Sequence, residues 1–166
     1  MTYSIVYSSR TGNTKLLAET IQKTLPAEDC IYFGESSPKA LEADRIYVGF
    51  WTDKGSCDES SGAFLKQITN QEVFLFGTAG FGEDPSYFEK ILHKTRGYLN
   101  KNAVLAGTYM CQGRMPMSVR DRYVKMKSSP IHMPNLDALI ENFDKALEHP
   151  DIADLMRLEE AVKTIR

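Results

Sequence analysis

The chain has 166 residues, of which 42% are hydrophobic and 25% are charged, and its formal net charge at pH 7 is −2. This composition predicts one globular domain over 1–166. It argues against nucleic-acid binding, while the absence of a long apolar run or a charged leader argues against a membrane span and a signal peptide. Three cysteines without a CxxC pair, and without metal-ligand spacing to histidine, favour the cytoplasm and no metal site.

Five apolar runs alternate with helical patterns along the chain. The runs lie at 2–7, 30–33, 45–51, 72–80 and 103–111. Helical spacing of apolar residues follows at 17–25, 64–68, 88–99, 136–147 and 155–165. Because the runs are apolar throughout, they predict an α/β fold in which a doubly wound, five-stranded parallel sheet is covered by helices on both faces.

A turn of small polar residues follows the first run and leads into a helix. The turn consists of Ser9, Arg10, Thr11, Gly12, Asn13 and Thr14. Ligands of such sheets bind beyond the carboxyl ends of the strands, and the free N–H groups of a helix start attract anions. The turn therefore predicts a phosphate cradle, with hydroxyl donors from Ser9, Thr11 and Thr14. The alternative is a turn that only caps the helix.

Two further strand ends carry aromatic residues on loops that contain glycine. The loop after the third run includes Phe50, Trp51, Thr52, Asp53 and Gly55. The loop after the fourth run includes Thr78, Ala79, Gly80, Phe81, Gly82, Asp84 and Tyr87. Each aromatic residue alone is compatible with a loop anchor. Together with the phosphate cradle, these loops predict a pocket for a phosphorylated planar cofactor.

The chain resembles the flavodoxins of the short-chain type over about residues 2–147. The S/T-x-T-G-x-T phosphate loop of that family stands here at residues 9–14. Beyond this range, apolar residues at helical spacing predict an extra C-terminal helix at about 151–166. The resemblance implies the strand order 2-1-3-4-5 and FMN as the cofactor. It implies Trp51 and either Phe81 or Tyr87 as the residues that stack on the flavin ring. It also implies Gly55 as the residue that tolerates positive φ when a peptide of its loop flips.

The resemblance implies a protein that shuttles single electrons between a reductase and an acceptor enzyme, with redox proteins as partners and no catalytic residue of its own. An FMN-dependent reductase of quinones or other flat conjugated acceptors is the alternative, because the same fold hosts such enzymes. A flavin-free signalling domain is disfavoured, since the first strand is not followed by an acidic cluster.

Five acidic residues lie near the aromatic loops in the sequence. They are Asp53, Asp58, Glu59, Glu83 and Asp84. Negative charge destabilises an anionic reduced flavin, so we expect these residues to lower its reduction potential. Helix capping is the main role expected of Asp58 and Asp84.

The segment 113–134 is expected to be a loop, and it is long for a connection. It contains the basic and methionine residues Arg114, Met115, Met117, Arg120, Arg122, Lys125, Met126 and Lys127. One interpretation is a surface insertion with a helical turn near 119–126. The other is a docking surface beside the cofactor, because methionine surfaces adapt to partners.

Overall fold

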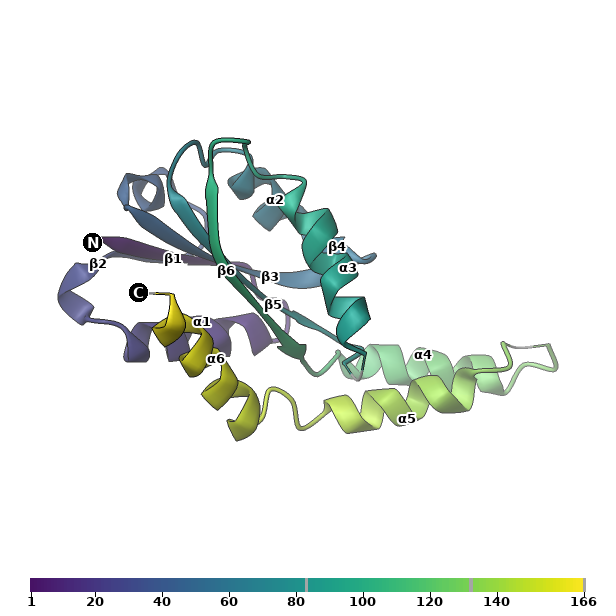
Figure 1. The fold of residues 1–166 in the computed structure, drawn as a ribbon. Coiled ribbons are helices and arrows are strands. Elements are labelled where there is room, and N and C mark those ends of the chain that lie inside the picture. Colours follow the sequence, from purple (N-terminus) through teal and green to yellow (C-terminus); the bar gives the residue numbers. More distant parts are fainter. Residues whose placement is uncertain (83, 132, 166) are drawn as a thin grey trace.

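The central sheet of the computed structural model is built from parallel strands, and the structure describes residues 1–82, 84–131 and 133–165 (Figure 1). The strands are β1 Tyr3–Tyr7, β2 Cys30–Gly34, β3 Arg45–Asp53, β4 Ser56–Cys57, β5 Glu72–Ala79 and β6 Val104–Gln112. Their order is β2-β1-β3-β5-β6, while β4 pairs antiparallel with the end of β3. The predicted parallel order is therefore confirmed, and β4 is an addition that the sequence did not reveal.

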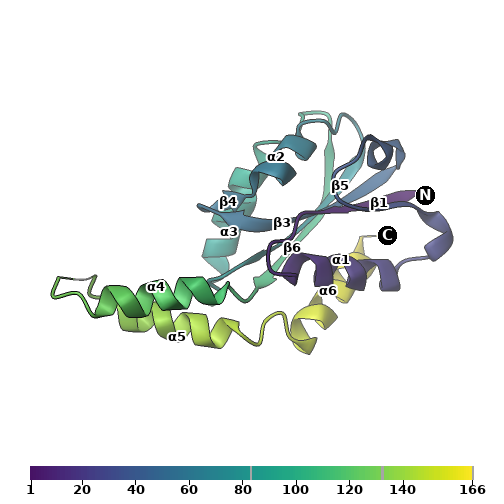
Figure 2. The same ribbon diagram turned by 180° about the vertical axis from the view of Figure 1, so that it is seen from behind.

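Helices cover both faces of the sheet (Figure 2). The helices are α1 Asn13–Thr24, α2 Glu59–Leu65, α3 Pro85–Arg96, α4 Met117–Lys127, α5 Leu136–Ala146, α6 Ile152–Thr164 and the short 3₁₀ helices η1 Ala27–Asp29 and η2 Pro38–Glu42. Buried residues of α1 and α6 pack with Tyr47 on one face, and buried residues of α2 and α3 pack with Ile46 and Val48 on the other. Successive strand residues thus enter opposite cores, which explains why the strands are apolar throughout.

The predicted C-terminal helix is present as α6, and it packs against α1 and β6. It begins with a capping box, in which the Asp151 side chain accepts from the Asp154 amide and the Asp154 side chain accepts from the Asp151 amide. The helix thus completes the cover of one sheet face.

Helices α4 and α5 lie side by side and extend away from the sheet as an arm (Figures 1 and 2). The segment 113–134 is not a loop throughout, because residues 117–127 form α4; the helical turn that one interpretation placed near 119–126 is present and is part of this longer helix. Ion pairs join α4 to α5, with Arg120 Nε 2.8 Å from Asp144 Oδ1 and Lys127 Nζ 2.5 Å from Asp137 Oδ1. Since these contacts link residues distant in sequence, local periodicity does not reveal the helix.

None of the helices in the described residues combines the length and the apolar character that crossing a membrane requires.

The side chain of Asp58 caps α2 and fixes the loop between β4 and α2. It is buried, and its oxygens accept hydrogen bonds from the Ser61 amide at 3.1 Å, the Ser61 hydroxyl at 2.8 Å and the Trp51 amide at 3.2 Å. Asp84 caps α3 in the same way, since it accepts from the Ser86 amide at 2.9 Å. The capping roles expected of both residues are therefore confirmed.

We expect Asp58→Ala to lower the free energy of unfolding by about 2 kcal/mol, because it removes a cap and leaves buried donors unpaired. Urea denaturation measures this change. Glu59→Ala, which removes the exposed neighbouring carboxylate, is the control and should change stability by less than about 0.5 kcal/mol. Equal effects of the two substitutions would show that Asp58 does not hold this loop.

Candidate functional site

The three predicted loops and the start of the arm enclose a cavity of about 340 Å³ at the carboxyl ends of β1, β3 and β5. Most of the predicted site residues line it. They are Ser9, Arg10, Thr11, Asn13, Thr14, Trp51, Thr52, Gly55, Thr78, Ala79, Gly80, Phe81 and Tyr87. The structure thus brings together loops that lie up to 78 residues apart, as the difference between Ser9 and Tyr87 shows.

Helix α1 starts at this cavity without a side-chain cap. Its N-cap is Gly12, with φ at +89°, a left-handed conformation that glycine adopts at least cost. The Ser9 hydroxyl accepts from the Gly12 amide at 3.1 Å and the Lys15 amide at 3.3 Å, and no side chain in the described residues accepts from the amides of Asn13 and Thr14. The first turn therefore presents unpaired N–H groups and the positive end of the helix dipole, a combination that binds anions.

Three polar side chains of this turn bond to other parts of the protein. The Thr14 hydroxyl is buried and donates to the Phe50 carbonyl at 3.0 Å. Thr11 Oγ1 and Asn13 Nδ2 donate to the Arg114 carbonyl at 3.3 and 2.8 Å. The hydroxyls of Thr11 and Thr14 thus fix the turn against the Arg114 carbonyl and β3. That they donate to a ligand stays a prediction.

The loop after β3 is a tight hairpin that turns back into β4. Lys54 and Gly55 occupy the turn, with φ at 52° and 81°, and the flanking residues Thr52 and Asp53 pair with β4. Positive φ at both turn residues is typical of the type I′ hairpins that match strand twist. The positive φ predicted for Gly55 is present.

Aromatic side chains from the end of β3, the loop after β5 and the start of α3 line the cavity. Trp51 is half-buried, and the Arg10 guanidinium carbon lies 5.5 Å from the centre of its ring. Phe81 and Tyr87 meet edge to face with ring centres 6.1 Å apart. Burial raises the pKa of the Tyr87 phenol, so this hydroxyl stays protonated at neutral pH. These rings offer flat apolar surface next to the uncapped helix.

Five predicted residues do not line this cavity. They are Gly12, Phe50, Asp53, Gly82 and Asp84. Phe50 is wrong as a side-chain contact, because its ring is fully buried in the core. Asp84 caps α3, and Gly82 lines a second cavity. Glu83, expected to carry charge near this site, lies outside the described residues.

Sequence reasoning missed eight lining residues, most of which belong to the arm and the segment before it. They are Lys54, Gly113, Arg114, Met115, Pro116, Val119, Arg122 and Tyr123. The basic, methionine-rich composition of 113–134 was the available signal, but it did not show which residues turn toward the cavity. As a result the charge of the lining differs from expectation: it contains Arg10, Lys54, Arg114 and Arg122, and no Asp or Glu among the described residues.

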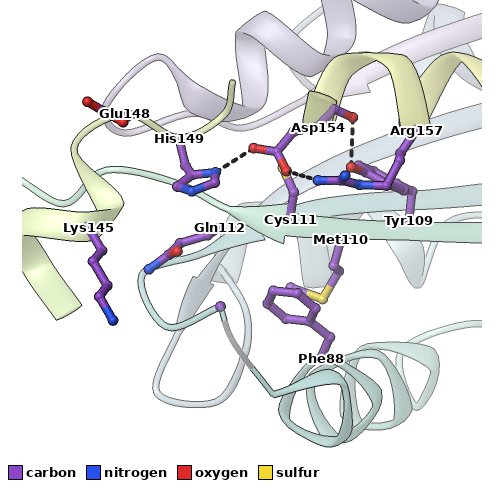
Figure 3. A pocket seen from close by; sticks show the side chains of 11 residues that line it. Phe88, Tyr109, Met110, Cys111, Gln112, Lys145, Glu148, His149, Asp154 and Arg157 are labelled. Atoms are coloured by element: carbon purple, nitrogen blue, oxygen red, sulfur yellow. Dashed lines mark hydrogen bonds and ion pairs between the residues drawn. The ribbon is translucent and has the colours of Figure 1, made fainter. Parts of the chain in front are cut away.

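A second cavity of about 460 Å³ lies beside β6 (Figure 3). Its polar centre is Asp154, with Oδ2 located 2.6 Å from His149 Nδ1 and Oδ1 accepting from Arg157 at 2.6 Å. Cys111 also lines it, and burial raises the pKa of this thiol well above its ordinary value. A neutral buried thiol is a poor nucleophile.

The group of His149, Asp151 and Asp154 has ligand atoms within 4.8 Å of one another, which a metal ion could bridge. Both Asp154 oxygens already accept from N–H groups, and the Arg157 cation lies against one of them. We therefore assign this group to capping of α6. It also connects to the first cavity, because the His149 carbonyl accepts from the Arg114 amide at 3.1 Å.

Comparisons with known proteins point to one family. The sequence profile described as "Flavodoxin domain" matches residues 4–163. A flavodoxin-like domain-containing protein, BilS of Clostridium symbiosum, is 37% identical over 172 residues, covering 93% of this chain and 90% of its own length.

Solved flavodoxin structures have the same fold. The flavodoxin of Streptococcus pneumoniae TIGR4 superposes with a TM-score of 0.61 at 15% identity, covering 99% of this chain and 97% of its own. The FMN-bound flavodoxin of Fusobacterium nucleatum superposes with a TM-score of 0.59 at 14% identity, covering 99% and 96%.

The Asp154 network predicts a pH-dependent contribution to stability. Burial alone would raise the pKa of the Asp154 carboxyl, but hydrogen bonds from His149, the Asp151 amide and Arg157 outweigh it and lower the pKa. A lowered folded-state pKa gives stability that is complete above the ordinary carboxyl pKa, near 4, and is lost as the pH falls through the lowered value.

We expect Asp154→Asn to cost about 2 kcal/mol of unfolding free energy at pH 7 and progressively less below about pH 4. Urea denaturation from pH 7 to pH 3 measures the difference from the wild type. Glu160→Gln, on the exposed side of the same helix, is the control. A cost of Asp154→Asn that stays constant with pH would contradict the lowered pKa.

Proposed function

Because this chain belongs to the flavodoxin domain family, we propose that it binds FMN in the 340 Å³ cavity and carries electrons between redox proteins. The observation that carries this proposal is the uncapped start of α1, which opens into a cavity lined by cations and aromatic rings. A phosphate group would accept hydrogen bonds from the amides there, and a flavin ring would pack against the aromatic side chains.

The first turn of α1 would hold the phosphate of FMN. The backbone N–H groups of Asn13 and Thr14 face no side-chain cap, and the left-handed Gly12 keeps the turn open. Thr11 and Asn13 hold the turn against the Arg114 carbonyl, so its geometry exists before the ligand binds. Arg114 belongs to the cavity lining and adds a positive charge beside this turn. The residues present therefore fit a phosphate without a metal ion.

The aromatic loops would hold the flavin ring. Trp51 lines the cavity from the end of β3 and Phe81 from the loop after β5, and Tyr87 supports Phe81 from α3. FMN supplies the ring that stores and releases electrons when it is bound. The protein excludes water from the buried part of the ring, while Phe81, which is 38% exposed, leaves an edge accessible to a partner.

A carrier is favoured over an FMN-dependent reductase of flat conjugated acceptors. The described lining residues include no histidine, cysteine or carboxylate, the side chains that most often move protons near pH 7. A cavity of 340 Å³ is also near the lower limit for one drug-sized ligand, so it leaves little room for a substrate beside FMN.

The partners would be a reductase and an acceptor protein, which dock where Phe81 and the arm border the cavity. Arg120 and Lys127 are paired with carboxylates of α5, so steering of partners rests on the remaining charges of α4. The three cysteines are free thiols, which supports a cytoplasmic location.

Titration of the apoprotein with FMN, followed by fluorescence of Trp51, tests this function. We expect strong quenching by FMN, because Trp51 lines the cavity and is the only tryptophan of the chain. Riboflavin, the same ring without phosphate, is the control ligand. It should bind about 100-fold more weakly, since two charge-assisted hydrogen bonds to the phosphate are lost. Equal affinities for the two flavins, or full Trp51 emission with FMN present, would contradict the proposal.

A further inference from the structure

We infer that helix α4 is part of the cofactor site, and that Arg122 on this helix raises the potential at which the bound flavin accepts electrons. The inference rests on the proposed binding of FMN. It departs from the sequence-based expectation that acidic residues surround the flavin and lower its potential.

One face of α4 and the residues just before it form a wall of the cavity. Met115, Val119, Arg122 and Tyr123 follow one another at intervals of four, three and one residues, and all line the cavity. This spacing places them on the same side of a helix. Lys125 lies one turn further along α4, outside the lining.

Several contacts hold this wall in place. The Arg114 amide donates to the His149 carbonyl at 3.1 Å, and its own carbonyl accepts from the phosphate turn through Thr11 and Asn13. The Arg120 side chain bonds both oxygens of Asp144 on α5, at 2.8 and 3.3 Å. The arm is thus connected to the sheet at its base, and ion pairs hold α4 against α5 along its length. These contacts fix the position of the helix that carries Arg122 relative to the cavity.

The carboxylates expected near the flavin are directed elsewhere in the described structure. Asp58 is buried in the cap of α2, and Asp84 caps α3. Asp53 belongs to the β3–β4 hairpin and is absent from the described lining. The cationic side chains of the lining therefore face no carboxylate within it, and Arg122 forms no ion pair with the described residues.

This charge distribution favours the reduced cofactor. FMN that takes up two electrons and one proton gains one negative charge on its ring. A cation nearby stabilises that charge. The Arg114 carbonyl lies at the phosphate turn and Arg10 lies over Trp51, whereas Arg122 comes from α4 and has no partner among the described residues. Arg122 is therefore the charge that α4 contributes to the cavity.

Three substitutions isolate this effect. Arg122→Gln removes the lining charge, Arg122→Lys retains it, and Lys125→Gln removes one charge from the same helix outside the lining. For each FMN-loaded variant, the midpoint potential is measured by equilibrium reduction against a dye of known potential, at low and high salt. Affinity for oxidised FMN is measured separately by the quenching titration.

We expect Arg122→Gln to shift the potential to a more negative value than that of wild type, Arg122→Lys and Lys125→Gln, which should agree with one another. Because the Arg122 side chain is exposed, the shift should be larger at low salt than at high salt. Equal potentials for Arg122→Gln and Lys125→Gln would overturn the inference. So would a loss of FMN affinity with an unchanged potential, because it would assign Arg122 to the phosphate. A wild-type protein that binds no FMN would instead overturn the proposed function.

Discussion

The first turn of α1 begins without a side-chain cap, and much of the structure around it serves to hold that turn in place. The amides of Asn13 and Thr14 cannot bond within the helix, and no side chain in the described residues accepts from them. The Thr14 hydroxyl ties the turn to β3, and the Thr11 and Asn13 side chains tie it to the carbonyl of Arg114. Because these unpaired donors are already held in position, little conformational entropy is lost when an anion binds to them.

The arm of α4 and α5 adds a wall to the cavity. It leaves the sheet after β6, and its base is connected both to the phosphate turn and, through the His149 carbonyl, to the cap of α6. Asn142 of α5 also donates to the Gly80 carbonyl at 3.0 Å, so the arm contacts the loop after β5 as well. These contacts make the arm a wall of the cavity, and they connect its position to the folding of the C-terminal helix.

The sequence predicted the sheet and the three loops because these depend on local signals. Buried strands are apolar on both sides, Asp84 and Pro85 mark a helix start, and glycine marks the turns with positive φ. The full length of helix α4 could not be predicted in this way, although a helical turn near 119–126 was one interpretation. An ion pair that holds it connects residues 24 positions apart, from Arg120 to Asp144. The sequence also could not show which face of the sheet the Phe50 side chain enters, because both faces of β3 are apolar.

The central claim is that FMN binds with its phosphate on the unpaired amides of α1. The most direct test is the change in the ¹H–¹⁵N amide resonances when the apoprotein is titrated with FMN. This account predicts that the amides of Thr11, Asn13 and Thr14 show the largest changes, together with those of the loop that carries Trp51. Changes confined to the cavity beside β6, around Tyr109 and His149, with the α1 amides unmoved, would contradict it.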